Sequence, residues 1–441
     1  MVGLLRRSGM PFAARRLALA DAALAAPRAA APAGAVAFPW ARAWPFVNGV
    51  DRLRAGETVE ITTPGAGAYG LPAEPDPAAV ESDRPQRWTS PPRRRHLRSF
   101  GIALWHMAVP PLLIGGAVTS VSHPIGAVQV AASIEYEIIP RPAGLPGDMR
   151  ALPGAKLQFL SIKAIDGFKV QAALWEPENK PPADTTMIVQ VHGSGGNLAS
   201  LPLRATARAM SAKEYAALSI STRQHDEHVN TDNFFDLRRD IEAAITTAKA
   251  LGYKSIVLQG HSLGTVQVEF YAATDWDPTI KAVILTGAFG KLPWKARHIL
   301  IQNEENYKAL VDASLSALEA GKPDQILPIK MRWLGGLETP VTAQHFLTYR
   351  DEQTSAADGT YWISRIPHPI LIVRDEADGL VLPFEPYMLL SAAHAEGSLV
   401  PSIEYVPLPN HRAPSREGHQ FTDNTQALID AVAAWLADQH L

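Results

Sequence analysis

The sequence predicts an α/β protein built on a mostly parallel β-sheet with helices on both faces. Two observations lead to this fold class. From Lys156 onward, short apolar runs typical of buried strands alternate with amphipathic stretches typical of helices. In addition, residues 259–264, QGHSLG, place a Gly-x-Ser-x-Gly pattern between one such run and the next helical stretch. At 441 residues, the chain is long enough for two ordinary domains or for one large domain with extensions.

Composition excludes several classes of function. The formal net charge of −3 gives no electrostatic reason to expect a nucleic-acid partner. The chain has no cysteine, so disulfides, thiolate zinc sites and a cysteine nucleophile are ruled out. Apolar residues make up 46% and charged residues 19% of the chain, which is typical of a globular protein.

The N-terminal region differs in composition from the rest. Residues 1–99 are rich in Ala, Pro, Arg and Gly, and we expect them to form a disordered extension because they cannot bury enough apolar surface. Residues 100–132 contain an apolar segment, at 100–121, that follows the basic stretch 93–98 and resembles a secretory signal or a membrane anchor. An exported or anchored location and a cytoplasmic one stay open, as does the presence of residues 1–132 in the mature protein.

The folded region is expected at residues 150–441 and begins with a hairpin. Its strands, 157–162 and 168–175, flank the turn signal Asp166-Gly167. Strands and helices then alternate: strand 187–191, helix 204–213, strand 216–221, helix 232–251, strand 255–258, helix 263–273 and strand 282–286.

A segment from about 288 to 364 breaks this rhythm. It carries helical pieces at 303–318 and 341–349, and we expect it to be a helical lid inserted into the domain. The strand pattern resumes at 369–373 and 403–408, and a last helix is expected at 424–438. Four large aromatic residues of the insertion could form its core or an apolar acyl pocket: Trp294, Trp333, Phe346 and Trp362.

Ser262 stands in the context that a nucleophile requires. A strand precedes it, a helix follows it, and Gly260 and Gly264 flank it at a spacing that permits a very tight turn. Such a turn holds the serine in a strained conformation at the C-terminal edge of the sheet, where open α/β sheets bind ligands. The N-terminus of the following helix then points its N–H groups at developing negative charge.

With this context, residues 155–438 resemble the α/β-hydrolase superfamily of esterase- and lipase-like serine hydrolases. The resemblance implies a catalytic triad in the chain order Ser262, acid, histidine. It also implies an oxyanion hole, because His192-Gly193-Ser194 follows the third predicted strand. The two donors would be the backbone N–H groups of Ser194 and Leu263.

The acid and the base are implied by the same resemblance. Asp378 has the family's spacing after strand 369–373, and Asp375 and Glu376 are its rivals. Two histidines follow the last strand. The family pattern favours His419, and His411 stays open as an alternative base.

Other histidines are candidates for lining the site. They are His192 beside Gly193, His261 beside the nucleophile, and His225. Residues 225–228, His-Asp-Glu-His, could in principle bind a metal, but no third ligand is evident in the sequence. We therefore expect pocket lining or a surface loop there, and neither a metal nor a cofactor.

The implied activity is hydrolysis of a carboxylic ester through an acyl-enzyme intermediate. The substrate would be a small-molecule ester, with bulky or apolar groups only weakly favoured. An amidase or peptidase, a lactonase, or a cofactor-free haloperoxidase-like enzyme of the same fold are alternatives, and a non-catalytic binding protein is another. Membrane association would depend on residues 100–121 alone. The sequence leaves the substrate and the oligomeric state open.

Overall fold

The computed structural model describes residues 88–89, 135–301, 303–329, 331–332 and 338–441. The predicted disordered extension and the apolar segment at 100–132 therefore lie outside the described residues, apart from the pair 88–89. Within the described part of the chain, no helix is long and apolar enough to cross a membrane.

A ten-stranded sheet forms the centre of the fold, with the strand order β1-β12-β11-β8-β7-β5-β6-β4-β3-β2. The six strands from β12 to β6 in this order run parallel, and the outer strands pair antiparallel. This confirms the predicted mostly parallel sheet. The strands are β1 Trp88–Thr89, β2 Tyr136–Ile139, β3 Ala155–Lys163, β4 Lys169–Pro177, β5 Thr186–Val191, β6 Ala216–Ser221, β7 Ser255–His261, β8 Ile280–Thr286, β11 Ile370–Asp375 and β12 Ile403–Leu408.

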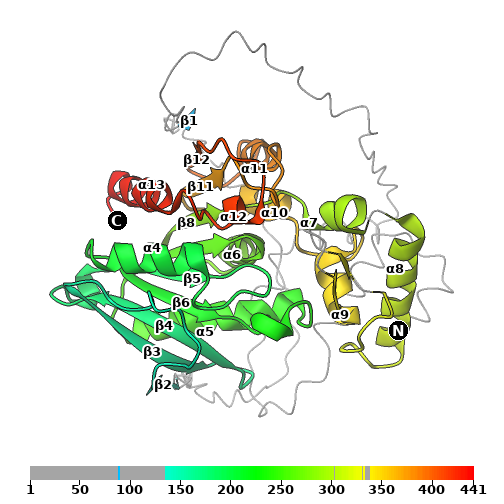
Figure 1. The fold of residues 1–441 in the computed structure, drawn as a ribbon, viewed down its shortest axis with the longest axis horizontal. Coiled ribbons are helices and arrows are strands. Elements are labelled where there is room, and N and C mark those ends of the chain that lie inside the picture. Colours follow the sequence, from blue (N-terminus) through cyan, green and yellow to red (C-terminus); the bar gives the residue numbers. More distant parts are fainter. Residues whose placement is uncertain (1–87, 90–134, 302, 330, 333–337) are drawn as a thin grey trace, which may run out of the picture.

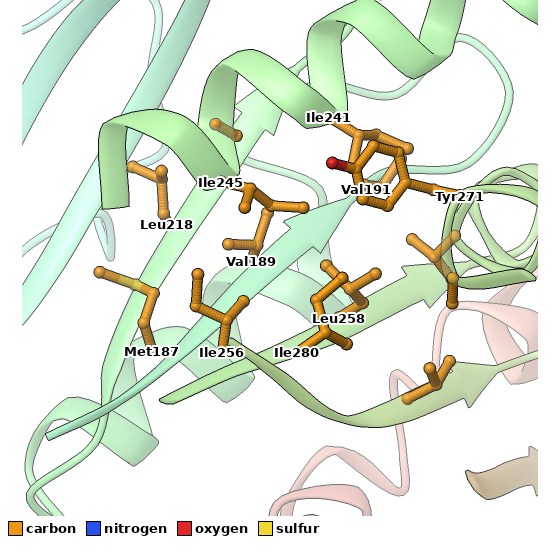
Figure 2. Close-up of a cluster of buried hydrophobic side chains, with 14 of the residues drawn as sticks. Met187, Val189, Val191, Leu218, Ile241, Ile245, Ile256, Leu258, Tyr271 and Ile280 are labelled. Carbon is orange, nitrogen blue, oxygen red and sulfur yellow. The ribbon is translucent and has the colours of Figure 1, made fainter. Parts of the chain in front are cut away.

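Helices cover both faces of this sheet (Figure 1). On one face, α4 and α13 pack with Val257, Ile284 and Val373 of the strands. On the other face, α5, α6 and α11 cover a second apolar layer, and Figure 2 shows its Ile241 and Ile245 beside strand residues. The helices are α4 Leu201–Ser211, α5 Leu237–Ala250, α6 Leu263–Thr274, α11 Glu385–Ala393, α12 Arg416–His419 and α13 Thr425–Asp438, with short 3₁₀ turns η3 Pro182–Asp184, η4 Asp226–His228 and η5 Phe234–Asp236.

Two helix boundaries differ from the prediction. The helix expected from residue 232 begins at Leu237, after a 3₁₀ turn in which the Asn233 side chain accepts a hydrogen bond from the Phe235 backbone N–H. The helix expected from residue 204 begins earlier, at Leu201, with Pro202 in its first turn. Proline is favoured there because the first helical N–H groups have no acceptor within the helix.

The segment between β8 and β11 folds into helices around an apolar cluster of its own that includes Leu300, Leu310 and Phe346. Figure 1 shows α7, α8 and α9 gathered beyond one end of the sheet. Its elements are α7 Leu292–Lys295, the π-helix η6 Ala296–Ile301, α8 Glu304–Glu319, β9 Met331–Arg332, β10 Glu338–Thr339, α9 Ala343–His345, the π-helix η7 Phe346–Arg350, α10 Gly359–Trp362 and the 3₁₀ turn η8 Ile363–Arg365. That this insertion acts as a lid stays a prediction.

The insertion is hydrogen-bonded to the core loop that follows β6. The Asp232 carboxylate accepts hydrogen bonds from His345 Nδ1, at 3.0 Å, and from the Tyr349 hydroxyl, at 2.6 Å. Phe346 and Trp362 are buried in apolar clusters, so they form core rather than an exposed apolar lining. Of the other two aromatic residues, Trp294 is half-buried and Trp333 lies outside the described residues.

Candidate active site

The turn that carries Ser262 is as tight as the glycine spacing predicts. Ser262 has φ of 52° and ψ of −122°, between the end of β7 and the start of α6. A Cβ atom at Gly260 would lie 2.4 Å from the Gly264 carbonyl oxygen, and one at Gly264 would lie 2.3 Å from the Val191 carbonyl oxygen. Both positions therefore require glycine, and their packing holds the non-glycine Ser262 in a left-handed conformation that costs about 1–3 kcal/mol.

A buried carboxylate–histidine pair lies next to this turn. His419 Nδ1 is 2.8 Å from Asp378 Oδ2, and Asp378 Oδ1 accepts hydrogen bonds from the backbone N–H groups of Leu380 and Val381. Burial alone would raise the pKa of Asp378, but His419 and these two N–H groups outweigh it and lower the pKa below its usual value. Asp378 is thus ionised, and it orients His419 with the proton on Nδ1 and a lone pair on Nε2.

The end of β8 places this pair close to Ser262. The Ser262 backbone N–H donates to the Thr286 carbonyl oxygen at 3.0 Å. The next residue, Gly287, has φ of 59°, and a Cβ atom there would lie 3.0 Å from His419 Cε1 and 3.5 Å from Asp378 Oδ2. Thr286 and Gly287 thus connect Ser262 with His419 and Asp378. The sequence predicted no role for either residue, although a glycine directly after a buried strand could have indicated one.

Ser262 and His419 are not hydrogen-bonded to each other in this structure. His419 Nε2 is buried and has no hydrogen-bond partner among the described residues. Hydrogen bonds between a nucleophile and its base are often long in ligand-free enzymes and tighten when substrate binds, so the arrangement is compatible with proton transfer from Ser262.

The loop after β5 lies directly against Ser262. A Cβ atom at Gly193 would lie 2.8 Å from Ser262 Cβ and 3.3 Å from Ser262 Oγ. The buried His192 fixes this loop, because its Nδ1 donates to the Gly193 carbonyl oxygen at 2.6 Å and its Nε2 accepts from the Thr222 backbone N–H at 3.0 Å. Burial lowers the pKa of His192 to about 4, so the ring is uncharged and serves as a brace. Ser194 follows Gly193 in this braced loop.

Three alternatives from the sequence lie elsewhere. Asp375 is buried, but its carboxylate accepts hydrogen bonds from the Ala377 N–H and from the side-chain amides of Asn410 and Asn424. Glu376 is exposed, as is His411. In the structure, therefore, the histidine that contacts Asp378 is His419 and not His411. Asp375 and Glu376 take no part in this pair.

The His-Asp-Glu-His stretch lies beside the Gly193 loop. His225 Nδ1 is 2.9 Å from Asp226 Oδ2, and the His225 and His228 rings meet edge to face at 5.3 Å. The Asp226 backbone N–H donates to the Gly196 carbonyl oxygen, so the stretch packs on the outside of that loop. In the part of the chain that the structure describes, no group of three or more His, Cys, Asp or Glu side chains could hold a metal ion.

His261, the remaining candidate, is buried and contacts both the end of β8 and His419. Its Nδ1 donates to the Thr286 carbonyl oxygen at 3.1 Å, and its ring lies 4.9 Å from the ring of His419. Because it does not reach solvent, it does not line an open site.

Comparisons with known proteins agree with this architecture. The family model described as "alpha/beta hydrolase fold" matches residues 188–314, which include Ser262. No curated protein sequence matches the chain.

Solved structures that are similar to the chain share little sequence with it. Est1E from Butyrivibrio proteoclasticus with bound ferulic acid is 21% identical over 63% of this chain and 98% of its own, with a TM-score of 0.47. The esterase domain of a Rhodothermus marinus protein is 19% identical over 64% and 98%, with a TM-score of 0.43. The hypothetical protein PA2218 from Pseudomonas aeruginosa is 14% identical over 69% and 98%, with a TM-score of 0.49. From the family match, the strand order and the turn at Ser262, the chain has the α/β-hydrolase fold.

Proposed function

We propose that the protein is a serine hydrolase that cleaves a carboxylic ester, with Ser262 as nucleophile, His419 as base and Asp378 as the acid that orients the base. One observation carries the proposal: the buried, hydrogen-bonded Asp378–His419 pair is packed through Gly287 beside the strained turn of Ser262. A nucleophile, a base with a bare Nε2 and a carboxylate behind the base are the groups that acyl transfer requires.

The reaction would begin when His419 Nε2 takes the Ser262 hydroxyl proton while Ser262 Oγ attacks the acyl carbonyl carbon. The backbone N–H groups of Ser194 and Leu263 would donate to the oxyanion of the tetrahedral intermediate. His419 would then give the proton to the leaving alcohol, which leaves an acyl-Ser262 ester. A water molecule would then give a proton to His419 and attack this ester. As the second tetrahedral intermediate collapses, His419 would return the proton to Ser262 Oγ, which releases the carboxylic acid and free Ser262.

Two features support the proposed oxyanion hole. The close approach of Gly193 to Ser262 Cβ and Oγ puts the Gly193-Ser194 backbone beside the attacking atom. Leu263 is the first residue of α6, so its N–H is among the helix N-terminal groups that have no acceptor within the helix.

An amidase or peptidase and a lactonase use the same catalytic groups and are the alternatives. A panel of p-nitrophenyl esters of increasing chain length, assayed beside amino-acid anilides and lactones, separates them by which substrate gives the highest kcat/KM. The buried positions of Phe346 and Trp362 remove part of the reason to favour bulky apolar esters, so short and polar esters belong in the panel.

The decisive variant is Ser262→Ala. Loss of a triad nucleophile lowers kcat by about 10⁶-fold in a comparable enzyme, so we expect activity to fall to background and labelling by a fluorophosphonate probe to disappear. Ser316→Ala, which removes an exposed hydroxyl on α8, is the matched control and should retain both. Near-full activity in Ser262→Ala, or a wild-type protein that neither reacts with the probe nor hydrolyses any member of the panel, would refute the proposal.

A further inference from the structure

The imidazole of His261 lies against the imidazole of His419. The two ring centroids are 4.9 Å apart, with the ring planes inclined at 37°. His261 is 1% exposed, and Phe421 contacts its ring from another side with centroids 6.2 Å apart. The proposed base is therefore bordered by a second, fully enclosed histidine that the mechanism above does not use.

The contacts of His261 define which of its nitrogens carries the proton. The Thr286 carbonyl oxygen can only accept a hydrogen bond, so Nδ1, 3.1 Å away, must donate to it. In the uncharged ring, Nε2 is then an acceptor. It faces the side-chain amide nitrogen of Gln420 at 3.4 Å, and that amide can donate. Gln420 follows His419 directly in the chain, so this contact ties the backbone of the base to His261.

The surroundings keep the His261 ring uncharged. Burial is the largest cause, and His419 acts in the same direction; together they lower the pKa of His261 to about 3. His192 after β5 adds to this effect, while Asp378 after β11 and the Thr286 carbonyl of β8 oppose it. At neutral pH the ring that faces His419 is thus a neutral aromatic surface.

A neutral aromatic ring next to a base can stabilise the charged form of that base. During acyl transfer His419 becomes an imidazolium, and the face of an aromatic ring attracts a cation, more strongly where water is excluded. A charged neighbour at the same position would instead repel the imidazolium. Asp378 contacts the proposed base at Nδ1, and the His261 ring lies 4.9 Å from its ring centroid with the planes inclined at 37°, so the two contacts restrain different motions of the ring.

We propose that His261, as the uncharged tautomer with its proton on Nδ1, is a positioning residue that holds the His419 ring and stabilises its charged form. The proposal deepens the serine-hydrolase function and rests on it for its kinetic consequences. It concerns the contact between the two rings, which can be measured without any substrate.

The test compares three substitutions. His261→Leu removes the aromatic face and both hydrogen bonds, His261→Phe keeps an aromatic face and removes the hydrogen bonds, and Gln420→Met removes only the contact with the amide. His394→Gln, at an exposed position at the end of α11, is the control for loss of a histidine. Each protein is first checked for folding by its melting curve, and kcat, KM and the pH profile are then measured on the best ester of the panel.

We expect His261→Leu to lower kcat about tenfold with KM changed less than twofold. The acid limb of its kcat/KM profile should move to lower pH by about 0.5–1 unit, because the imidazolium is less stable without the aromatic face. His261→Phe should keep the wild-type position of the acid limb, and Gln420→Met should lower kcat about two- to threefold. The His419 ring signals in ¹H–¹⁵N spectra, assigned by their loss in His419→Gln, should show the same shift of titration midpoint in His261→Leu.

A purely structural role would give a different result. His261→Leu and His261→Phe would then lose activity in proportion to their loss of folded protein, with the acid limb and the His419 titration midpoint unchanged, and this outcome would overturn the proposal. If the midpoint moves in a protein that hydrolyses no ester and binds no fluorophosphonate, the ring contact stands and the serine-hydrolase function fails. If His261→Leu does not fold, the other two variants decide. The proposal is also overturned if Gln420→Met has the kcat of wild type and the acid limb of His261→Phe is shifted.

Discussion

Glu269 lies on α6, about two turns beyond Ser262, and its carboxyl group is completely buried. Neither carboxyl oxygen has a hydrogen-bond partner among the described residues. Burial, followed by the nearby acidic Asp358, raises the pKa of Glu269 well above its ordinary value. We therefore expect Glu269 to keep its proton to higher pH in the folded protein than in the unfolded chain, and we predict that replacing it by Gln changes how stability depends on pH.

The size of this effect follows from proton linkage. In the unfolded chain Glu269 ionises near its ordinary value of about 4.3, whereas in the folded protein it keeps its proton to much higher pH. Unfolding then releases one proton, so the free energy of unfolding falls by about 1.4 kcal/mol for each pH unit above the unfolded value, until the folded pKa is reached. Over the pH range between the two pKa values, wild type therefore loses stability relative to Glu269→Gln as the pH rises.

The assay is urea-induced unfolding at pH 5, 6, 7 and 8, followed by tryptophan fluorescence in both proteins. The stability of Glu269→Gln relative to wild type should increase steadily over this range. Asp240→Asn on α5 provides a contrast, because burial also raises the pKa of Asp240 but this carboxylate forms an ion pair with Arg223 at 2.7 Å. Breaking that pair should destabilise the protein, by about 3–5 kcal/mol. Two unfolding series that run parallel in pH for wild type and Glu269→Gln would show that the folded carboxyl is ionised and would refute the reasoning.

Two further predictions concern the site and its turn. His419→Gln and Asp378→Asn should each lower kcat/KM by about 10³–10⁴-fold, while His411→Ala, at an exposed position, should stay within twofold of wild type in the same ester assay; a large loss in His411→Ala would assign the base differently. Gly264→Ala should unfold at markedly lower temperature or fail to accumulate as soluble protein, because its Cβ would meet the Val191 and His192 carbonyl oxygens at 2.3 and 2.7 Å. Gly147→Ala, where a Cβ meets nothing within 4 Å, is its control, and equal melting temperatures for the two variants would contradict the packing argument.

The parallel centre of the fold could be predicted because its strands are buried on both faces and are therefore continuous apolar runs. β5 and β11 are buried at every position, and both were expected from sequence. Helix α11 was not expected, because Pro383 and Pro386 interrupt the pattern around its start. In the structure Pro386 occupies the first turn of α11, where the missing N–H has no acceptor to lose.

The start of α5 could not be read from the sequence for a different reason. Apolar periodicity predicted a helix from residue 232, but the Asp232 carboxylate accepts hydrogen bonds from His345 and Tyr349 of the insertion. These partners are more than 100 residues away in the chain. Such a contact is set by the tertiary fold, and no local pattern around residue 232 reports it.

The same distinction separates Ser262 from His419. The geometry around Ser262 is local, so two glycines at fixed spacing predict it. The choice between His411 and His419 depends on how the loop after β12 folds back on the loop that carries Asp378. Ser415 exchanges backbone hydrogen bonds with Ala377 and Gly379, at 2.8 and 2.9 Å, and a Cβ at Gly418 would lie 2.1 Å from the Ala377 carbonyl oxygen.

The Asp375 carboxylate contacts both ends of this loop. It binds the side-chain amides of Asn410 and Asn424, which bracket the stretch that contains both histidines. His411 is next to the first of these anchors and is exposed. His419 lies between the anchors, where the Ser415 and Gly418 contacts press the chain against the Asp378 loop. The carboxylate that rivalled Asp378 in the sequence thus binds both ends of this stretch, and within it His419 is the histidine that contacts Asp378.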